Sequence, residues 1–99
     1  MTIYVDPLMQ HGWRLGPSCH LFTDPGNLDA LHAFALRIGL KRIWFQDHRR
    51  MPHYDLTASR RAVAVRLGAK ELSRRETVAV MDSWSPRKPI LNDDSFTNQ

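Results

Sequence analysis

Cysteine is almost absent from this sequence. Its only cysteine, Cys19, cannot form a disulfide bond within the chain, so the fold must depend on a hydrophobic core. No apolar run approaches the roughly 20 residues needed to cross a bilayer. The first ten residues also lack the basic stretch and apolar core of a secretory signal. We therefore expect a cytoplasmic protein without a membrane partner.

The overall composition is that of an ordinary globular chain. Of the 99 residues, 42% are hydrophobic and 24% are charged. This balance excludes a fully disordered polymer, a collagen-like repeat and a pure coiled coil. The length suits one compact domain. We expect that domain to cover residues 1–85 and to be followed by a flexible carboxyl tail, 86–99.

Acidic residues are scarce in the middle of the chain. The net charge of +4 is carried by residues 37–75, which hold eleven Lys or Arg against three acidic side chains, a balance of +8. The segments 1–36 and 76–99 each have a balance of −2. Most of the basic residues are arginines, which suit bidentate contact with phosphate or carboxylate. The basic middle indicates either a binding surface for an anionic partner or a solvated face of the fold.

Strands and a helix are predicted in the first forty residues. Residues 2–5 and 19–23 have the β-branched and alternating pattern of short strands, and a loop rich in Gly and Pro separates them at 7–18. Apolar residues at helical spacing then predict a helix over 28–38. Gly39 would close that helix as a left-handed cap.

A second strand–helix unit is predicted after Gly39. Residues 41–46, KRIWFQ, predict a third strand, and residues 47–54 predict a polar loop. A second helix is expected from about residue 58 to residue 67, before Gly68.

Two segments of the sequence resemble each other, 35–43 and 64–72, with four of nine positions identical. In each, a helix end containing Arg is followed by a capping Gly and by an apolar residue that begins a strand. The second copy therefore predicts a strand at 70–73, parallel to 41–46. The expected fold is a small α/β domain with a mostly parallel sheet of about four strands and flanking helices.

A third helix is predicted after this last strand. Ser73 and Glu76 have the spacing of a capping box. The residues expected to face inward from it are Val78, Met81 and Trp84. The run 77–80 also suits a strand, and we prefer the helix.

Polar side chains follow several of the predicted strands. Ligands of open α/β sheets bind beyond the carboxyl ends of the strands, so we expect a site where these side chains collect. The residues expected at this edge of the sheet are Asp24, Gln46, Asp47, His48, His53, Tyr54, Asp55 and the turn 73–75. Asp6 joins them if the first strand runs in the same direction.

The segment 53–61 has the strongest local signal for binding. Asp55 or Thr57 is a natural N-cap, and free backbone N–H groups at a helix start attract an anion. Arg60 and Arg61 lie unfavourably at this positive helix end unless a phosphate, or a carboxylate of the protein itself, neutralises them. The predicted ligand-binding residues are Thr57, Ser59, Arg60 and Arg61, with Tyr54, His48, Arg49 and Arg50 beside them.

Catalysis at the same place would depend on His53 and Asp55. Histidine titrates near neutrality, so His53 beside Asp55 suits a general acid or base, and these two are the predicted catalytic residues. Cys19 lies in a predicted strand rather than at a helix start and is a poor nucleophile.

Metal-ligating residue types are present, but their spacing is not that of a metal motif. The aspartates at predicted strand ends suit Mg²⁺ and equally suit turns and caps; they are Asp6, Asp24, Asp47 and Asp55. Zinc ligand types occur at Cys19, His20, His48 and His53 without the paired spacing of a zinc site. We predict neither a metal nor another cofactor.

Several ordered motifs of the sequence are distinctive. They are Tyr4-Val-Asp6, Cys19-His-Leu21, LHAFALRIGL at 31–40, Trp44-Phe-Gln46, His53-Tyr-Asp55 and the segment from Ser59-Arg-Arg-Ala62 to Gly68. Together they resemble the family DUF4031, small phage and bacterial proteins of unknown function. The likeness covers about residues 2–75. The resemblance implies domain boundaries and not a mechanism, and the phage setting implies a host-directed binding protein.

Three functions are compatible with these features. The first is a binding module for a phosphate-bearing ligand, nucleic acid or nucleotide, at the carboxyl edge of the strands. The alternatives are a metal- or histidine-assisted phosphoesterase or nuclease at that edge, and an inhibitor that binds an acidic host protein. Steep weakening by salt would distinguish nucleic acid from a single nucleotide. Whether the protein is an enzyme, and its oligomeric state, stay open.

Overall fold

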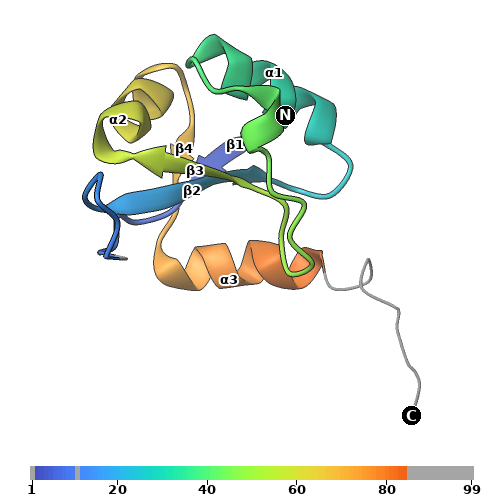
Figure 1. The fold of residues 1–99 in the computed structure, drawn as a ribbon. Helices are drawn as coiled ribbons and strands as arrows, with labels where there is room; N and C mark the ends of the chain where they lie inside the picture. The colour runs from blue at the N-terminus through green and yellow to red at the C-terminus, as the bar shows by residue number, and fades with distance from the viewer. Residues whose placement is uncertain (1, 11, 85–99) are drawn as a thin grey trace.

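The computed structural model describes residues 2–10 and 12–84, so the tail expected at 86–99 lies outside the described residues. Figure 1 shows an α/β fold, with helices on both faces of one sheet. In chain order the elements are β1 (Ile3–Val5), β2 (Ser18–Thr23), α1 (Leu28–Arg37), the 3₁₀ helix η1 (Arg42–Trp44), β3 (Tyr54–Thr57), α2 (Ala58–Arg66), β4 (Lys70–Glu71) and α3 (Arg74–Ser83). No helix within the described residues is long and apolar enough to span a membrane.

The sheet has four strands, as expected, but it is mixed rather than mostly parallel. Its strand order is β3-β2-β1-β4, in which β1 pairs antiparallel with β2, β2 pairs antiparallel with β3, and only β1 and β4 are parallel. Residues 6–17 connect β1 to β2, and within this connection Met9 forms an antiparallel bridge with Ser18. The described part of the connection contains no crossover helix, and the chain returns beside β1 in the antiparallel direction.

The predicted strand at 41–46, and with it the parallel pairing to 70–73, is wrong. The amides of Trp44 and Phe45 bond to the carbonyls three residues earlier, which makes a 3₁₀ turn, and Ile43 is 84% exposed. Because a strand needs a partner and a buried face, high β-propensity alone does not make this segment part of the sheet. The strand that pairs with β2 is instead β3, in a segment that was predicted to be a loop and the start of a helix. The other strand of the predicted pair, at 70–73, is present as β4 but pairs with β1.

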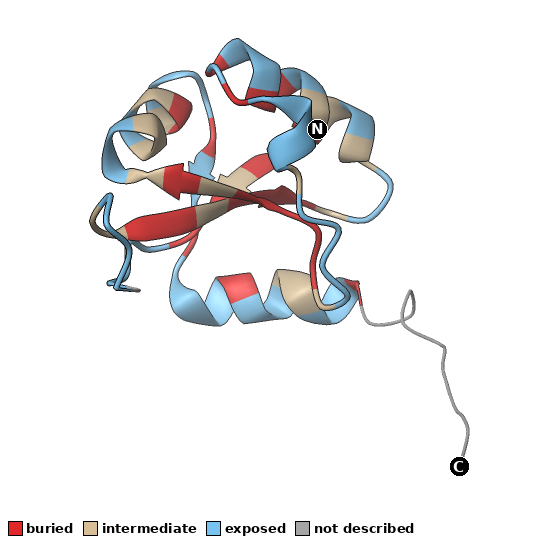
Figure 2. Cartoon of the chain, in the orientation of Figure 1, coloured by how far each residue is buried: buried red, intermediate tan, exposed pale blue. Residues whose placement is uncertain are grey.

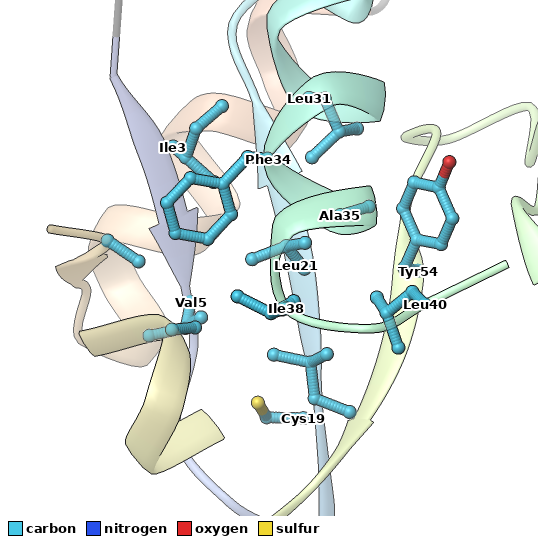
Figure 3. Packing of buried hydrophobic residues seen from close by; sticks show 13 residues of the cluster. Ile3, Val5, Cys19, Leu21, Leu31, Phe34, Ala35, Ile38, Leu40 and Tyr54 are labelled. Carbon is cyan, nitrogen blue, oxygen red and sulfur yellow. The ribbon is translucent and has the colours of Figure 1, made fainter. Parts of the chain in front are cut away.

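The larger core lies between the sheet and the two helices α1 and α2. Figure 3 shows apolar side chains of β1, β2 and β3 meeting those of α1, among them Val5, Leu21 and Leu31, which are fully buried. On β3, Tyr54 and Leu56 face this core while Asp55 between them is only half-buried. The period-2 alternation of 53–57 is therefore the signal of a strand with one buried face.

A smaller core lies on the opposite face of the sheet, beneath α3. It contains Phe22, Met51, Leu72 and Trp84, all buried. The indole of Trp84 donates a hydrogen bond from Nε1 to the carbonyl of Thr23 at 2.9 Å, which attaches the end of α3 to β2. Figure 2 shows α3 mostly exposed, with its buried positions on the side that faces the sheet.

Helix ends follow the predicted local rules. Gly39 has a φ of +87° after α1, and a Cβ at this position would meet the guanidinium of Arg60. Ser73 and Glu76 make both hydrogen bonds of the capping box, which confirms the helix over the alternative strand at 77–80. Of the three residues expected to face inward from α3, Trp84 is buried and Met81 partly so, but Val78 is 44% exposed.

Candidate functional site

Three polar side chains meet on the sheet face that carries α3. His20 of β2 lies directly opposite Asp55 of β3 in the strand register, and His53 precedes Asp55 by two positions. Residues two apart on a strand share a face, so these three side chains point the same way. The Nε2 atom of His53 lies 3.5 Å from Oδ1 of Asp55, and Nε2 of His20 lies 4.0 Å from the same oxygen. We call this group the His20–His53–Asp55 cluster.

Each member of the cluster makes a further hydrogen bond to a residue outside the cluster. The Nδ1 atom of His20 is 2.8 Å from Oδ2 of Asp6. The Nδ1 atom of His53 is 2.9 Å from the carbonyl oxygen of Met51, and Nε2 of Gln46 donates to Oδ2 of Asp55 at 2.6 Å. These contacts leave one nitrogen of each ring and one carboxylate oxygen directed at one another.

The environments of the two histidines shift their pKa values in opposite directions. The hydrogen bond that the ring of His20 donates to the carboxylate of Asp6 raises the pKa of His20, although burial opposes it. Burial lowers the pKa of His53, against the hydrogen bond to the Met51 carbonyl. His53 is therefore neutral at pH 7, as a general base must be.

A cavity of about 360 Å³ opens beside the cluster, between the sheet and α3. Its lining includes His20, His53 and Asp6 together with three further side chains that are basic or carry an imidazole, His48, Arg50 and Arg74. The segment between η1 and β3 carries His48 and Arg50 along the edge of the sheet towards the end of α3 (Figure 1). Arg50 is fixed there by an ion pair to Asp82 of α3 at 2.9 Å, and its amide donates to Nδ1 of His48 at 3.1 Å.

A second cavity, of about 440 Å³, lies along the outer edge of β3. Asp55 and Gln46 line it together with Trp13 and Trp44, whose surfaces are 39% and 46% exposed. Asp55 therefore belongs both to the His20–His53–Asp55 cluster and to this more apolar groove.

At the start of α2, where the anion site was predicted, Thr57 and Arg60 line the second cavity, and both arginines have hydrogen-bond partners within the protein. Thr57 is the N-cap, and its hydroxyl accepts a hydrogen bond from the amide of Arg60 at 3.3 Å. The guanidinium of Arg60 donates to the carbonyl of Ile38 at the end of α1. Arg61 donates from Nε to the carbonyl of Asp6 at 2.9 Å and pairs with Glu71 at 3.0 Å. The two arginines thus connect α2 to different neighbouring segments.

The other predicted ligand-binding residues are separated in the same way. Ser59 lies 3.2 Å from the hydroxyl of Thr57, at the exposed start of α2. Tyr54 is 1% exposed and faces the larger core, where its hydroxyl lies 2.8 Å from Nδ1 of His32. This placement argues against a ligand contact for Tyr54. His48, Arg49 and Arg50 lie in the loop before β3, and of these His48 and Arg50 line the cavity.

A family model described as a protein of unknown function (DUF4031) matches residues 3–83. The chain belongs to this family. The matched range of this DUF4031 chain contains the whole His20–His53–Asp55 cluster and extends through α3, beyond the likeness to residue 75 seen in the sequence. The comparison with curated proteins and the comparison with solved structures give no match.

In this DUF4031 chain, His20 was considered only as a zinc ligand type and was not among the predicted site residues. The sequence contained a usable signal, because His20 lies between the apolar residues Cys19 and Leu21 of a predicted strand. Side chains alternate between the two faces of a strand, so His20 faces away from the core that buries its neighbours. Asp6, Gln46, His53 and Asp55 were expected together at one edge, and the structure does bring them together. It does so through antiparallel neighbours rather than the carboxyl ends of parallel strands. Asp24 lies elsewhere and accepts a hydrogen bond from Tyr4 at 2.8 Å.

Cys19 faces away from the site. It is 2% exposed in the larger core, where burial raises the pKa of its thiol to about 12. A thiol of this kind is neither a nucleophile nor a ready metal ligand at neutral pH. This supports the prediction that Cys19 takes no part in catalysis.

Proposed function

We propose that this protein binds a phosphate-bearing ligand, a nucleotide or a nucleic acid, in the cavity between the sheet and α3. The observation that carries the proposal is the convergence of Arg50 and Arg74 with three imidazoles on one cavity. Arginine donors form charge-assisted hydrogen bonds to phosphate oxygens, and these are among the stronger polar contacts in proteins.

The cavity supports this proposal better than the start of α2 does. Both arginines at the start of α2 already donate to carbonyl groups of the protein. By contrast, the guanidinium of Arg74 donates to a weak acceptor, Sδ of Met9, at 3.5 Å, and Arg50 pairs with an exposed carboxylate. A surface ion pair contributes little to stability, so exchanging Asp82 for a phosphate costs Arg50 little.

The test measures binding of a short fluorescent oligonucleotide and of a mononucleotide in the presence of a chelator. The variant Arg50→Gln with Arg74→Gln should weaken binding at least about tenfold, which corresponds to a loss of about 1.4 kcal/mol. Arg37→Gln is the matched control, because Arg37 is an exposed arginine in the last turn of α1, the helix on the other face of the sheet. Steep weakening of oligonucleotide binding by salt would identify nucleic acid as the ligand.

Two results would reject the cavity as the binding site. One is wild-type affinity in the double variant. The other is an equal loss in Arg37→Gln, which would indicate a response to net charge alone. Capture of an acidic protein from nuclease-treated host lysate, with neither probe bound, would favour the inhibitor hypothesis instead.

Phosphoesterase activity is the second candidate, and the position of His53 favours it. Its ring is oriented by the Met51 carbonyl, lines the cavity and is neutral at pH 7 because burial lowers its pKa. A neutral imidazole beside bound phosphate can take a proton from an attacking water. Turnover of a phosphodiester that is lost in His53→Ala, while binding persists, would establish this activity.

A further inference from the structure

We propose that His20, His53 and Asp55 bind one first-row divalent transition metal ion of the zinc type. This site goes beyond phosphate binding and does not depend on it. The proposal stands on the positions of three donor atoms, on the hydrogen bonds behind them and on the charge pattern that these bonds create.

The donor atoms are already gathered at near-coordinating separations. Each residue of the cluster offers one ligand atom, and the three atoms lie within 4.8 Å of one another. Two of the separations are 3.5 and 4.0 Å, both to Oδ1 of Asp55. Zinc binds nitrogen and oxygen ligands at about 2.0–2.2 Å, so ligand atoms around it lie somewhat more than 3 Å apart. Small side-chain rotations therefore close the site.

The backbone gives this arrangement a rigid base. His20 and Asp55 are paired across β2 and β3, and His53 is bridged to Gln46 immediately before β3. Sites built on strands hold their ligands more precisely than sites built on loops. The geometry is thus set by sheet register and not by the conformation of a free loop.

Every ligand has an outer partner of the kind that metal-binding residues use. A ligating histidine usually donates its other ring N–H to a carboxylate or a backbone carbonyl, which fixes the tautomer and the ring direction. Here the carboxylate of Asp6 accepts this hydrogen bond from His20, and the carbonyl of Met51 accepts it from His53. Gln46 holds the second oxygen of Asp55 in the same manner.

These outer bonds set the tautomer of each neutral ring. A carbonyl oxygen only accepts, so Nδ1 of His53 carries the proton and Nε2 of the neutral ring presents a lone pair. The carboxylate of Asp6 favours the same tautomer in neutral His20. A divalent cation placed among the three donor atoms would be attracted by both ring nitrogens and by the carboxylate oxygen.

The ligand set selects the class of metal. Two imidazoles with one carboxylate suit Zn²⁺ and its neighbours in the first transition row, whereas Mg²⁺ prefers oxygen ligands alone. Three protein ligands also leave a coordination position open, as in catalytic zinc sites. His20 and His53 line the cavity, so a water or a phosphate oxygen reaches that position from there.

The experiment titrates metal-free protein with Zn²⁺ alone by calorimetry and with Co²⁺ by visible absorption. We expect one ion per chain, no competition from equimolar Mg²⁺, and loss of affinity of at least about tenfold in His53→Ala and in Asp55→Asn. His32→Gln is the matched control, because His32 lies in α1 and contacts Tyr54 and Phe45 on the other side of β3. It should bind both ions like the wild type.

Circular dichroism in the presence of chelator identifies any variant that fails to fold. If His53→Ala does not fold, Asp55→Asn still tests the site, because this substitution keeps the size of the side chain. Ring signals of the unmodified protein provide a variant-free measurement: Zn²⁺ should perturb His20 and His53 and leave His32 unchanged. The proposal is overturned by the absence of saturable wild-type binding, by equal binding in the folded cluster variants, or by perturbation of His32 instead. Because the phosphate assay is run in chelator, failure of one proposal does not affect the other.

Discussion

Asp6, which directly follows β1, makes hydrogen bonds to residues of β2 and α2. Its carboxylate accepts from the backbone N–H of His20 at 2.6 Å and lies 2.8 Å from the ring of His20, and its carbonyl accepts from Arg61 at 2.9 Å. The residue is 9% exposed, so these contacts form largely out of water. A buried carboxylate needs such partners, because an unpaired one would be strongly unfavourable. The orientation of His20 is therefore coupled to the packing of β1 against α2.

We expect the two cluster histidines to titrate on opposite sides of pH 6.5 in metal-free protein. The hydrogen bond to Asp6 raises the pKa of His20, and burial lowers that of His53. Asp6→Asn should therefore lower the pKa of His20. NMR of the ring protons across the neutral range, in chelator, measures both values.

The stability linked to His20 follows from the sign of its shift. A raised folded-state pKa gives stability that is fully present below the unfolded value of 6.5 and is lost as the pH rises through the folded value. Asp6→Asn should remove this part of the stability, which denaturant melts at several pH values can show. A wild-type pKa for His20 in the variant would mean that Asp6 does not hold the ring.

At the scale of elements, two adjacent arginines connect α2 to other segments, in addition to the packing of α2 in the larger core. Arg60 reaches the end of α1, and Arg61 reaches the end of β1 and the side chain of Glu71 in β4. These contacts explain the unfavourable position of two cations at a helix start. Their negative partners are carbonyl dipoles and a carboxylate of the protein, so no bound anion is required there.

Arg61→Ala should lower the free energy of unfolding by about 1.5–3 kcal/mol, the range for a hydrogen bond to a charged group. The side chain of Arg61 is 17% exposed, and its removal leaves the Asp6 carbonyl without this donor. Urea melts followed by circular dichroism measure the change. Arg66→Ala is the control, since Arg66 is exposed in the last turn of α2 and should change stability by no more than about 0.5 kcal/mol.

Unchanged stability of Arg61→Ala together with a loss of binding would support the anion site that was predicted from the sequence. If Arg61→Ala keeps full stability while oligonucleotide or phosphate binding falls sharply, the ligand binds at the start of α2. The cavity beneath the sheet would then have to be abandoned as the binding site.

At the scale of the whole molecule, the sheet separates two unequal cores. The larger core, shown in Figure 3, joins α1 and α2 to one face, and the smaller core attaches α3 to the other. Figure 1 shows this placement of the helices on the two faces. The cavity and the His20–His53–Asp55 cluster lie on the side of the smaller core. The site therefore depends on how firmly α3 is attached.

Trp84→Ala should destabilise the protein by about 3–5 kcal/mol, the usual cost of deleting a buried tryptophan side chain. Trp84 is 6% exposed, packs in the smaller core and donates to the carbonyl of Thr23. Thermal melts test this, with Trp44→Ala as the control because Trp44 is 46% exposed. Similar melting temperatures for the two variants would show that α3 is not held by Trp84.

Family membership and most local features were accessible from the sequence. The capping box at Ser73, the N-cap at Thr57 and the glycine after α1 were predicted and are confirmed. Each depends on bonds or dihedral angles within a few residues, so neighbouring residues are sufficient to specify it. The same holds for the general positions of β1, β2 and the three α-helices.

Strand pairing and the members of the site were decided by tertiary structure. Residues 41–46 and 54–57 both had sequences able to form a strand, and only the second places Tyr54 and Leu56 in the core with Asp55 opposite His20. The hydrophobic effect selects the pairing that buries a complete face, and this depends on helices distant in the sequence. The sequence by itself therefore determined the helix ends and the candidate residues Asp6, His53 and Asp55. The folded sheet brought His20 beside them and gave Arg60 and Arg61 partners within the protein, because side chains distant along the chain meet through strand register.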